Sequence, residues 1–240
     1  FVYWQPGANH RFVDTYPQSP ALFRIDDGVL TMSDSKVRIA GVNGPVFSLR
    51  TADSCGVGDF SDLKKLIDWA SRVGLKMIQI LPINDTISTY SFLDSYPYNA
   101  ISVFALNPLF LDIFKIGKLA DNQQQKQIED AAQKLNAEQD VDYERVIKLK
   151  LDYCRAVFGQ NQSEIIDNKD FKRFIKQSAE WLEPYAAFSA LRDKFRTGDF
   201  NCWGKFAKYS EREVREMFKS DSPYYADVTY WCYVQYELDH

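Results

Sequence analysis

Apolar residues between positions 41 and 81 follow two different periods. Short apolar runs at residues 46–50 and 77–81 predict β-strands. Between them, apolar residues recur every three or four positions, which predicts a helix with one apolar stripe: Leu63, Leu66, Ile67, Ala70 and Val73. Gly74 is placed to end this helix. A strand, a helix and a strand with short connections form a βαβ unit, so we expect two parallel strands and a right-handed crossover.

The character of the chain changes after Lys118, where polar segments carry apolar residues at helical spacing. This pattern predicts helices at residues 121–136, 142–158, 170–182, 184–195, 211–218 and 227–238. Pro184 is expected in the first turn of its helix, a position that proline favours. The helical segments share no repeat of fixed length. We therefore expect an α/β region followed by a helical region.

The first 40 residues follow neither pattern. Residues 1–4 predict a strand, and a turn that contains proline and glycine follows it. Residues 13–40 are mixed and polar, which is typical of a linker, with one short hairpin expected around Asp27 and Gly28. Both ends of the chain look cut within an element, so we expect an excised fragment of a longer protein.

The charge balance of the 240-residue chain argues against two classes of partner. Its 29 basic and 33 acidic residues give a net charge of −4, without a cluster of lysine and arginine that would follow a nucleic acid or bind an anionic membrane. No apolar run is long enough to span a bilayer, and no signal peptide is evident. We therefore expect no nucleic acid partner, no membrane partner and a cytoplasmic location.

The pattern of cysteine and histidine argues against a metal site. The four cysteines are widely spaced, which favours reduced thiols, and the histidines are His10 and His240, near the ends of the chain. The glycine-rich turn at residues 55–59 lacks the lysine and the serine or threonine of a phosphate-binding loop. We expect this turn to lead into a helix that Asp59 or Ser61 caps.

The candidate chemistry lies in the run DSYPYN at residues 94–99, which follows the second predicted strand and the loop at residues 82–86. Two tyrosines flank a proline, with a carboxylate before them and an amide after them. Aromatic faces beside fixed polar groups suit a sugar ring, which has apolar C–H faces and a rim of hydroxyls. The alternative is a surface turn that proline makes rigid and whose tyrosines cover the core.

Several motifs in order resemble the start of the 4-α-glucanotransferases, the amylomaltases or disproportionating enzymes of glycoside hydrolase family 77. The motifs are GPVFSLR at 44–50, GVGDF at 56–60, QILP at 79–82, DSYPY at 94–98, SVFALNP at 102–108, WLEPYA at 181–186 and VQY at 234–236. The NDT triplet at 84–86 is most similar to the branch that carries starch-binding modules. Residues 3–12 resemble the last strand of such a module over a shorter stretch.

The resemblance implies an α/β fold, an incomplete (β/α)8 TIM barrel with a large helical insertion. The implied domains are the end of a starch-binding module at 1–12, a linker at 13–40, the first strands and helix of the catalytic barrel at 41–117, and a helical subdomain at 118–240. Two barrel strands alone would leave unpaired edges, so self-association of the fragment is expected.

The resemblance also implies the activity of the parent protein, which is transfer of α-1,4-glucan segments between maltose, maltodextrins or glycogen without a cofactor or metal. In the family, the tyrosine at the position of Tyr98 stacks on the sugar ring at the point of cleavage. Asn99, Ser95 and Asp94 are then expected to make supporting contacts. Residues Asn84 and Asp85 are expected either to brace the loop or to contact the substrate.

No catalytic residue is expected in this chain. A retaining transfer by double displacement needs a carboxylate nucleophile and a second carboxylic acid about 5 Å away. The family's motifs for both lie beyond residue 240, so the fragment is predicted to be inactive. Asp59 and Asp62 are the nearest local pair of carboxylates, and helix capping already explains them. The alternatives are a noncatalytic carbohydrate-binding or scaffold fragment and a helical interaction domain.

Overall fold

The computed structural model describes residues 2–4, 30–32 and 39–240. The chain divides into two compact units, residues 1–40 and residues 41–240.

In the first unit, β1 (Val2–Trp4) pairs antiparallel with β2 (Leu30–Met32), with Tyr3 opposite Thr31. The expected strand at residues 1–4 is therefore present in its described part. The turn expected around residues 27 and 28 lies outside the described residues, as does most of the linker expected at 13–40.

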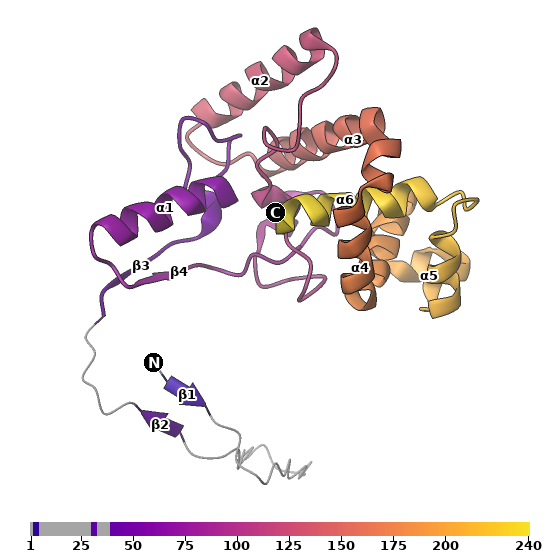
Figure 1. Cartoon of the computed structure of the whole chain (residues 1–240), viewed down its shortest axis with the longest axis horizontal. Helices are drawn as coiled ribbons and strands as arrows, with labels where there is room; N and C mark the ends of the chain where they lie inside the picture. Colours follow the sequence, from indigo (N-terminus) through magenta and orange to yellow (C-terminus); the bar gives the residue numbers. More distant parts are fainter. Residues whose placement is uncertain (1, 5–29, 33–38) are drawn as a thin grey trace. The chain divides into compact units, whose positions relative to one another are not determined.

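The second unit begins with the predicted βαβ arrangement. Strand β3 (Gly41–Asn43) pairs in parallel with β4 (Met77–Gln79), and α1 (Phe60–Arg72) connects them (Figure 1). Helix α1 begins with a capping box, in which the Asp59 side chain accepts from the backbone of Asp62 and the Asp62 side chain accepts from the backbone of Asp59. The predicted helix and its Asp59 cap are confirmed, and β4 lies within the strand predicted at 77–81, but its parallel partner is residues 41–43 and not the predicted 46–50.

The strand predicted at residues 46–50 is wrong, because this segment forms the 3-10 helix η1 (Val46–Ser48). The amides of Ser48 and Leu49 donate to the carbonyls of Pro45 and Val46 at 3.1 and 3.0 Å, which bends the chain into a turn. Gly58 packs directly against this turn, and its amide donates to the Phe47 carbonyl at 3.0 Å. Within this segment only Val46 is fully buried, in a cluster with Val57 and Val146 and without sheet pairing.

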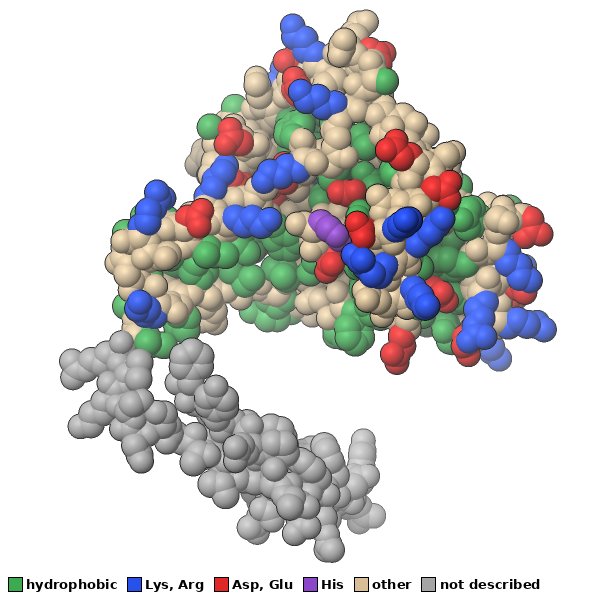
Figure 2. All heavy atoms as spheres, viewed as in Figure 1, with side chains coloured by type: hydrophobic (Ala, Val, Ile, Leu, Met, Phe, Trp, Pro, Cys, Tyr) green, Lys and Arg blue, Asp and Glu red, His purple; other side chains and the backbone are tan. Residues whose placement is uncertain are grey.

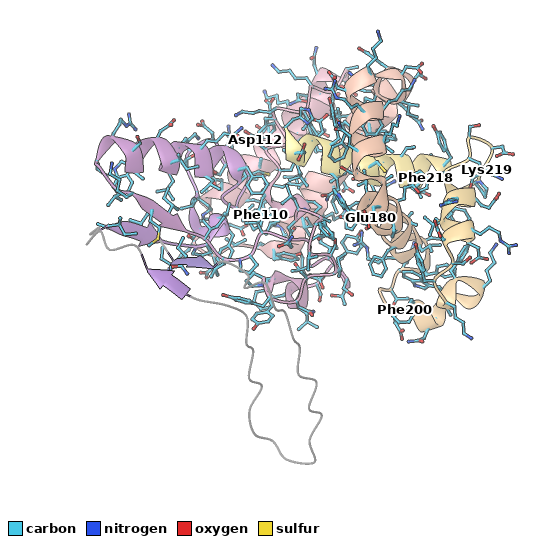
Figure 3. All side chains as sticks on the ribbon, turned by 60° about the horizontal axis from the view of Figure 1, so that its bottom comes forward. Phe110, Asp112, Glu180, Phe200, Phe218 and Lys219 are labelled. Carbon is cyan, nitrogen blue, oxygen red and sulfur yellow. The ribbon has the colours of Figure 1, made fainter. Side chains whose placement is uncertain are left out.

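After β4, two short 3-10 helices interrupt a long connection before the helical region begins: η2 (Phe92–Ser95) and η3 (Pro108–Phe110). The remaining elements are α2 (Asn122–Ala137), α3 (Tyr143–Asp167), α4 (Lys169–Phe195), η4 (Phe200–Cys202), η5 (Gly204–Ala207), α5 (Glu211–Met217) and α6 (Tyr225–Asp239). Helix α5 lies at the end of the molecule where Phe200 and Lys219 are marked (Figure 3).

The helices predicted at 170–182 and 184–195 are one continuous helix, α4, with Pro184 in its interior. The prediction that Pro184 lies in a first turn is therefore wrong. Proline removes the bond to the carbonyl four residues earlier, at Glu180, and that residue is exposed to water. Packing of the α4 face against α6 outweighs the local preference of proline.

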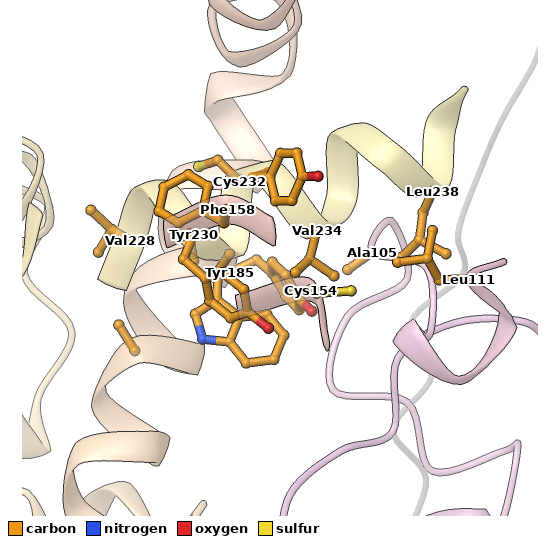
Figure 4. Packing of buried hydrophobic residues seen from close by; sticks show 14 of the residues in the cluster. Ala105, Leu111, Cys154, Phe158, Tyr185, Val228, Tyr230, Cys232, Val234 and Leu238 are labelled. Carbon is orange, nitrogen blue, oxygen red and sulfur yellow. The ribbon is translucent and has the colours of Figure 1, made fainter. Parts of the chain in front are cut away.

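The main core lies where α3, α4 and α6 meet (Figure 4). Helix α6 is buried over several consecutive turns, and its buried apolar side chains are Val228, Tyr230, Trp231, Cys232, Tyr233, Val234 and Leu238. A second, smaller cluster packs η1 against α3 and includes Val46, Val57, Ile87 and Val146. This second cluster ties the βαβ unit to the helical region. Within the described residues, no helix combines the length and the apolar character that crossing a membrane requires.

Candidate functional site

The connection after β4 forms one long loop whose two ends are tied together. Asn84 and Leu106 form an antiparallel bridge, and the Asp85 amide donates to the Ala105 carbonyl at 2.9 Å. The Asn84 side chain adds a bond to the Val103 carbonyl at 2.9 Å. Residues 86–104 therefore emerge from a closed base. We call residues 86–104 the platform loop.

Two aromatic rings stand on the surface of the platform loop. Tyr96 and Tyr98 are 60% and 62% exposed, and their ring centroids lie 5.6 Å apart at an interplanar angle of 47°. The Asn99 amide closes the turn by donating to the Tyr96 carbonyl at 3.3 Å. Asn99 is exposed and Ser95 is half-buried. These rings do not cover the core, which was the alternative that the sequence left open.

Asp94 lies beneath this turn with its carboxylate fully engaged. Its oxygens accept from the Thr89 amide at 2.9 Å, the Thr89 hydroxyl at 3.0 Å and the Tyr90 amide at 2.7 Å. The residue is buried. These hydrogen bonds hold the conformation of the platform loop from its buried side.

Asp85 is completely buried at the base of the loop. One carboxylate oxygen accepts from the Ile87 amide at 2.9 Å, and the other accepts from the Tyr185 hydroxyl at 2.7 Å. Burial raises the pKa of Asp85 to about 6, against the opposing effect of the Arg192 cation. Of the two roles that the sequence left open for Asp85, these contacts correspond to bracing of the loop.

The structure therefore sorts the six predicted site residues by depth. The turn brings Tyr98, Asn99 and Ser95 to the surface, whereas Asp94 and Asp85 lie below it and Asn84 ties the base. Sequence reasoning missed Arg192, which is fully buried on α4 and donates to the Ile87 carbonyl at 2.7 Å. The sequence did contain one indication of this. Arg192 stands four residues after Phe188 and so falls on the helix face that the apolar pattern predicts to be buried, where a cation needs partners.

An apolar groove of about 630 Å³ adjoins the end of the platform loop. It runs from residues 101–104 onto α4 and is lined by Phe104, Trp181 and Phe188, together with Tyr209 from the segment before α5. The Phe104 ring stacks on Trp181, with centroids 6.1 Å apart and an interplanar angle of 24°. The aromatic surface thus continues from the loop to the helical layer.

The carboxylates that follow η1 are committed to local structure. Asp59 accepts from the amides of Ser61 and Asp62 at 2.9 and 3.1 Å, and burial raises its pKa. Asp62 accepts from the hydroxyls of Ser54 and Thr51 at 2.6 and 2.7 Å. Burial acts to raise the pKa of Asp62, but these hydrogen bonds and one from Lys65 hold it below the usual value.

The described residues show neither a large patch of one charge in the view of Figure 2 nor a cluster of metal-ligating side chains. In the view of Figure 2, acidic and basic side chains are interspersed over the helical region. Among the residues that the structure describes, no three side chains of histidine, cysteine, aspartate or glutamate gather as metal ligands would.

Comparison with known proteins gives a consistent result. The sequence model of glycoside hydrolase family 77, described as 4-alpha-glucanotransferase, matches residues 44–240. The chain is 37% identical over 222 residues to 4-alpha-glucanotransferase DPE2 of Oryza sativa subsp. japonica, which covers 92% of this chain and 23% of the rice protein. It is 34% identical over 200 residues to the 4-alpha-glucanotransferase of Chlamydia muridarum, which covers 81% of this chain and 37% of that protein.

A third relative is the 4-alpha-glucanotransferase of Clostridium butyricum, which is 30% identical over 76% of this chain and 36% of its own length. The chain thus spans between about a quarter and a little over a third of the length of these relatives. The family match extends over most of the second unit and includes the platform loop. The chain belongs to the 4-alpha-glucanotransferase family, glycoside hydrolase family 77.

Proposed function

We propose that the full-length protein transfers α-1,4-glucan segments between maltodextrins, glycogen and related acceptors, in the cytoplasm and by a retaining double displacement. Family membership supports the reaction, and the three relatives described above carry the name of this activity. The reaction needs two carboxyl groups about 5 Å apart at the scissile bond. Asp59 and Asp62 are occupied by helix capping, so in this proposal the nucleophile and the acid/base lie outside this chain.

In the proposed architecture, residues 41–117 begin a (β/α)8 barrel, residues 118–240 form its helical subdomain, and residues 1–12 end a starch-binding module. Exposed apolar side chains beside the two parallel strands support a larger barrel, because they call for a covering layer: Ile67, Trp69, Val73 and Met77. The same residues support self-association of the isolated chain. Active sites of such barrels lie at the C-terminal ends of the strands, where the platform loop follows β4.

The single observation that carries the proposal is the exposed pair Tyr96 and Tyr98 on a loop with buried carboxylates below it. The Tyr98 ring offers an apolar face to a glucose ring, and Asn99 and Ser95 offer hydrogen bonds to its hydroxyls. Asp94, Asp85 and Asn84 hold the loop that presents them.

The test is the Tyr98→Ala variant of the full-length protein. Loss of an aromatic contact worth about 1.5 to 3 kcal/mol predicts a fall in kcat/KM for maltotriose disproportionation of about ten- to a hundredfold. Tyr98→Phe is the matched control, and it should stay within about threefold of the wild type because the ring face remains. Thermal stability should hardly change in either variant, because the side chain is exposed.

Wild-type activity of Tyr98→Ala would contradict the proposed platform. Glucan binding without any transfer by the full-length protein would favour the noncatalytic alternative. Release of glucose from maltotriose by residues 1–240 alone would contradict the proposal that the reacting carboxylates lie elsewhere.

A further inference from the structure

We propose that helices α4 and α6 position the Tyr98 ring through two buried anchors, and that Tyr90 and Tyr185 are the positioning residues of these anchors. This inference rests on the proposed function of the platform loop. One anchor holds the chain before the aromatic turn, and the other holds the chain after it.

The first anchor is built around Arg192, which is fully buried. Its guanidinium donates to the Ile87 carbonyl at 2.7 Å and to the Tyr90 hydroxyl at 2.8 Å. It also lies over the rings of Tyr90 and Trp231, at 4.9 and 4.7 Å from their centroids. Burying a cation costs free energy unless hydrogen bonds and aromatic rings such as these compensate for the lost water. These contacts therefore fix residues 87–90 of the loop to α4.

Tyr90 is held from two sides. Its hydroxyl donates to Asp193 on α4, and its amide donates to the Asp94 carboxylate at 2.7 Å. Its backbone φ of 58° is in the left-handed region, which a bulky residue adopts only where the surroundings enforce it. Asp94, which accepts this bond, directly precedes the aromatic turn. The left-handed conformation of Tyr90 therefore helps to set the direction in which the turn leaves Asp94.

The second anchor joins Asp85 to both helices. Tyr185 of α4 donates to the Asp85 carboxylate at 2.7 Å, and the Gln235 amide of α6 donates to the Tyr185 hydroxyl at 3.2 Å. Gln235 also accepts from the Leu106 amide and donates to the Leu106 carbonyl, both at 2.8 Å. The carbonyl of Asp85 in turn accepts from the Ile101 amide at 2.8 Å, just after the aromatic turn.

The two anchors leave only residues 95–100 between fixed points at Asp94 and Ile101. A side chain in so short a span has few orientations available. A site whose first contacts are held by packed, hydrogen-bonded neighbours does not have to be ordered by the ligand. The aromatic turn is therefore exposed to the solvent but fixed in direction by the helical region.

The experiment uses three conservative variants of the full-length protein. Tyr90→Phe and Tyr185→Phe each remove one anchoring hydroxyl and keep the ring. Tyr230→Phe is the matched control, because its buried hydroxyl on α6 donates to the Leu151 carbonyl of α3 at 3.1 Å. Because small misplacements in a site are expensive, kcat/KM for maltotriose disproportionation should fall about tenfold in each anchor variant and less than about twofold in the control. Losses of thermal stability should be similar in all three.

The decisive readout is the same change made in a Tyr98→Ala background. If Tyr185 acts through the platform, Tyr185→Phe should cause less than about a twofold further loss there, while its effect on the melting temperature persists. An undiminished tenfold loss in that background would overturn the positioning role, as would full activity of both anchor variants. Full activity of anchor variants while Tyr98→Ala is impaired would overturn the anchors and leave the proposed function standing. An unimpaired Tyr98→Ala would overturn both.

Discussion

The loops after β3 and β4 leave the same edge of the parallel pair, but they differ in how deeply they are buried. After β3, residues 54–59 are all buried against the helices. After β4, the platform loop carries Tyr96 and Tyr98 on its surface and exposes Leu93 by 75%. A place at the C-terminal ends of strands therefore does not make a loop a binding surface. What differs is how much of each loop the helices pack against.

The first loop is held at Arg50 and Thr51 by the end of α2 and the residues that follow it. The Arg50 guanidinium donates to the carbonyls of Glu138 and Gln139 at 2.8 and 3.0 Å, and Asn136 donates to the Thr51 carbonyl at 2.8 Å. The platform loop is instead held near its start, through Asp85 and Ile87, and Tyr96 and Tyr98 in its middle stay exposed to solvent. The comparison predicts that changes in the first loop act on stability and that changes at the platform tip act on activity.

The largest effect is expected at Gly58 in the first loop. A Cβ there would lie 2.2 Å from the Val46 carbonyl oxygen and 2.7 Å from the Leu49 amide nitrogen, and both are backbone atoms that cannot turn aside. Gly58→Ala should reduce the free energy of unfolding by about 3 to 4 kcal/mol in denaturant titration. Gly44→Ala is the control, because nothing lies within 4 Å of its Cβ position. Equal stability of the two variants would show that the turn is not packed as described.

The next effect concerns Asp85 and pH. Its pKa in the folded protein is about 6, above the usual 3.8, so the folded state holds the proton more tightly than the unfolded chain. Asp85 therefore makes the fold less stable as pH rises from about 4 to about 6, with no further change above that. At 1.36 kcal/mol per pKa unit, the loss at pH 7 is about 2 to 3 kcal/mol.

Asp85→Asn removes this titration, so the difference in unfolding free energy between variant and wild type should change by that amount between pH 4 and pH 7. A difference that stays constant with pH would contradict the raised pKa.

A smaller effect is expected at Asp62, whose role is confined to the first loop. Asp62→Ala leaves the hydroxyls of Ser54 and Thr51 without their acceptor, which should cost about 1 to 2 kcal/mol of unfolding free energy at pH 7. Because the pKa of Asp62 is lowered, the stabilisation that it adds should disappear as pH falls below 3.8. The kcat of the folded variant should equal the wild-type value, and a large loss of kcat would assign Asp62 to the chemistry.

The smallest effect on stability is expected at Tyr96. Tyr96→Ala removes an exposed ring that contacts Tyr98 at 5.6 Å between centroids. Loss of an aromatic partner worth about 1 kcal/mol should weaken maltoheptaose binding about fivefold, while the unfolding free energy stays within about 0.5 kcal/mol of the wild type. Isothermal titration and thermal unfolding of the same preparation test both halves. A loss of stability without a loss of affinity would assign Tyr96 to the fold.

The local features were the predictable ones. The cap at Asp59 and the end of α1 at Gly74, which has a φ of 80°, follow from residues within one turn of the helix. The short run at residues 46–50 could not be assigned in this way, because a few apolar residues after Pro45 suit a buried turn as well as a strand. The prediction that Pro184 begins a helix failed because the packing of α4 outweighs the local preference of proline.

The candidate site was predictable in its surface residues and not in its supports. The DSYPYN run predicted Tyr98 as a candidate from its own neighbours in sequence, and the structure places this ring on the surface. Asp85 and Tyr185 are 100 positions apart, and Leu106 and Gln235 are 129 apart, so their contacts depend on how the whole helical layer packs. A single sequence carries no local pattern that joins residues at such separations.

The most direct measurement is a crystal structure of the full-length protein with bound maltoheptaose. The account predicts a glucose ring stacked on the Tyr98 face at van der Waals distance of about 4 Å, with a hydroxyl within hydrogen-bond reach of Asn99 or Ser95. A bound glucan that leaves the platform loop untouched, or a Tyr98 ring covered by another part of the protein, would contradict it.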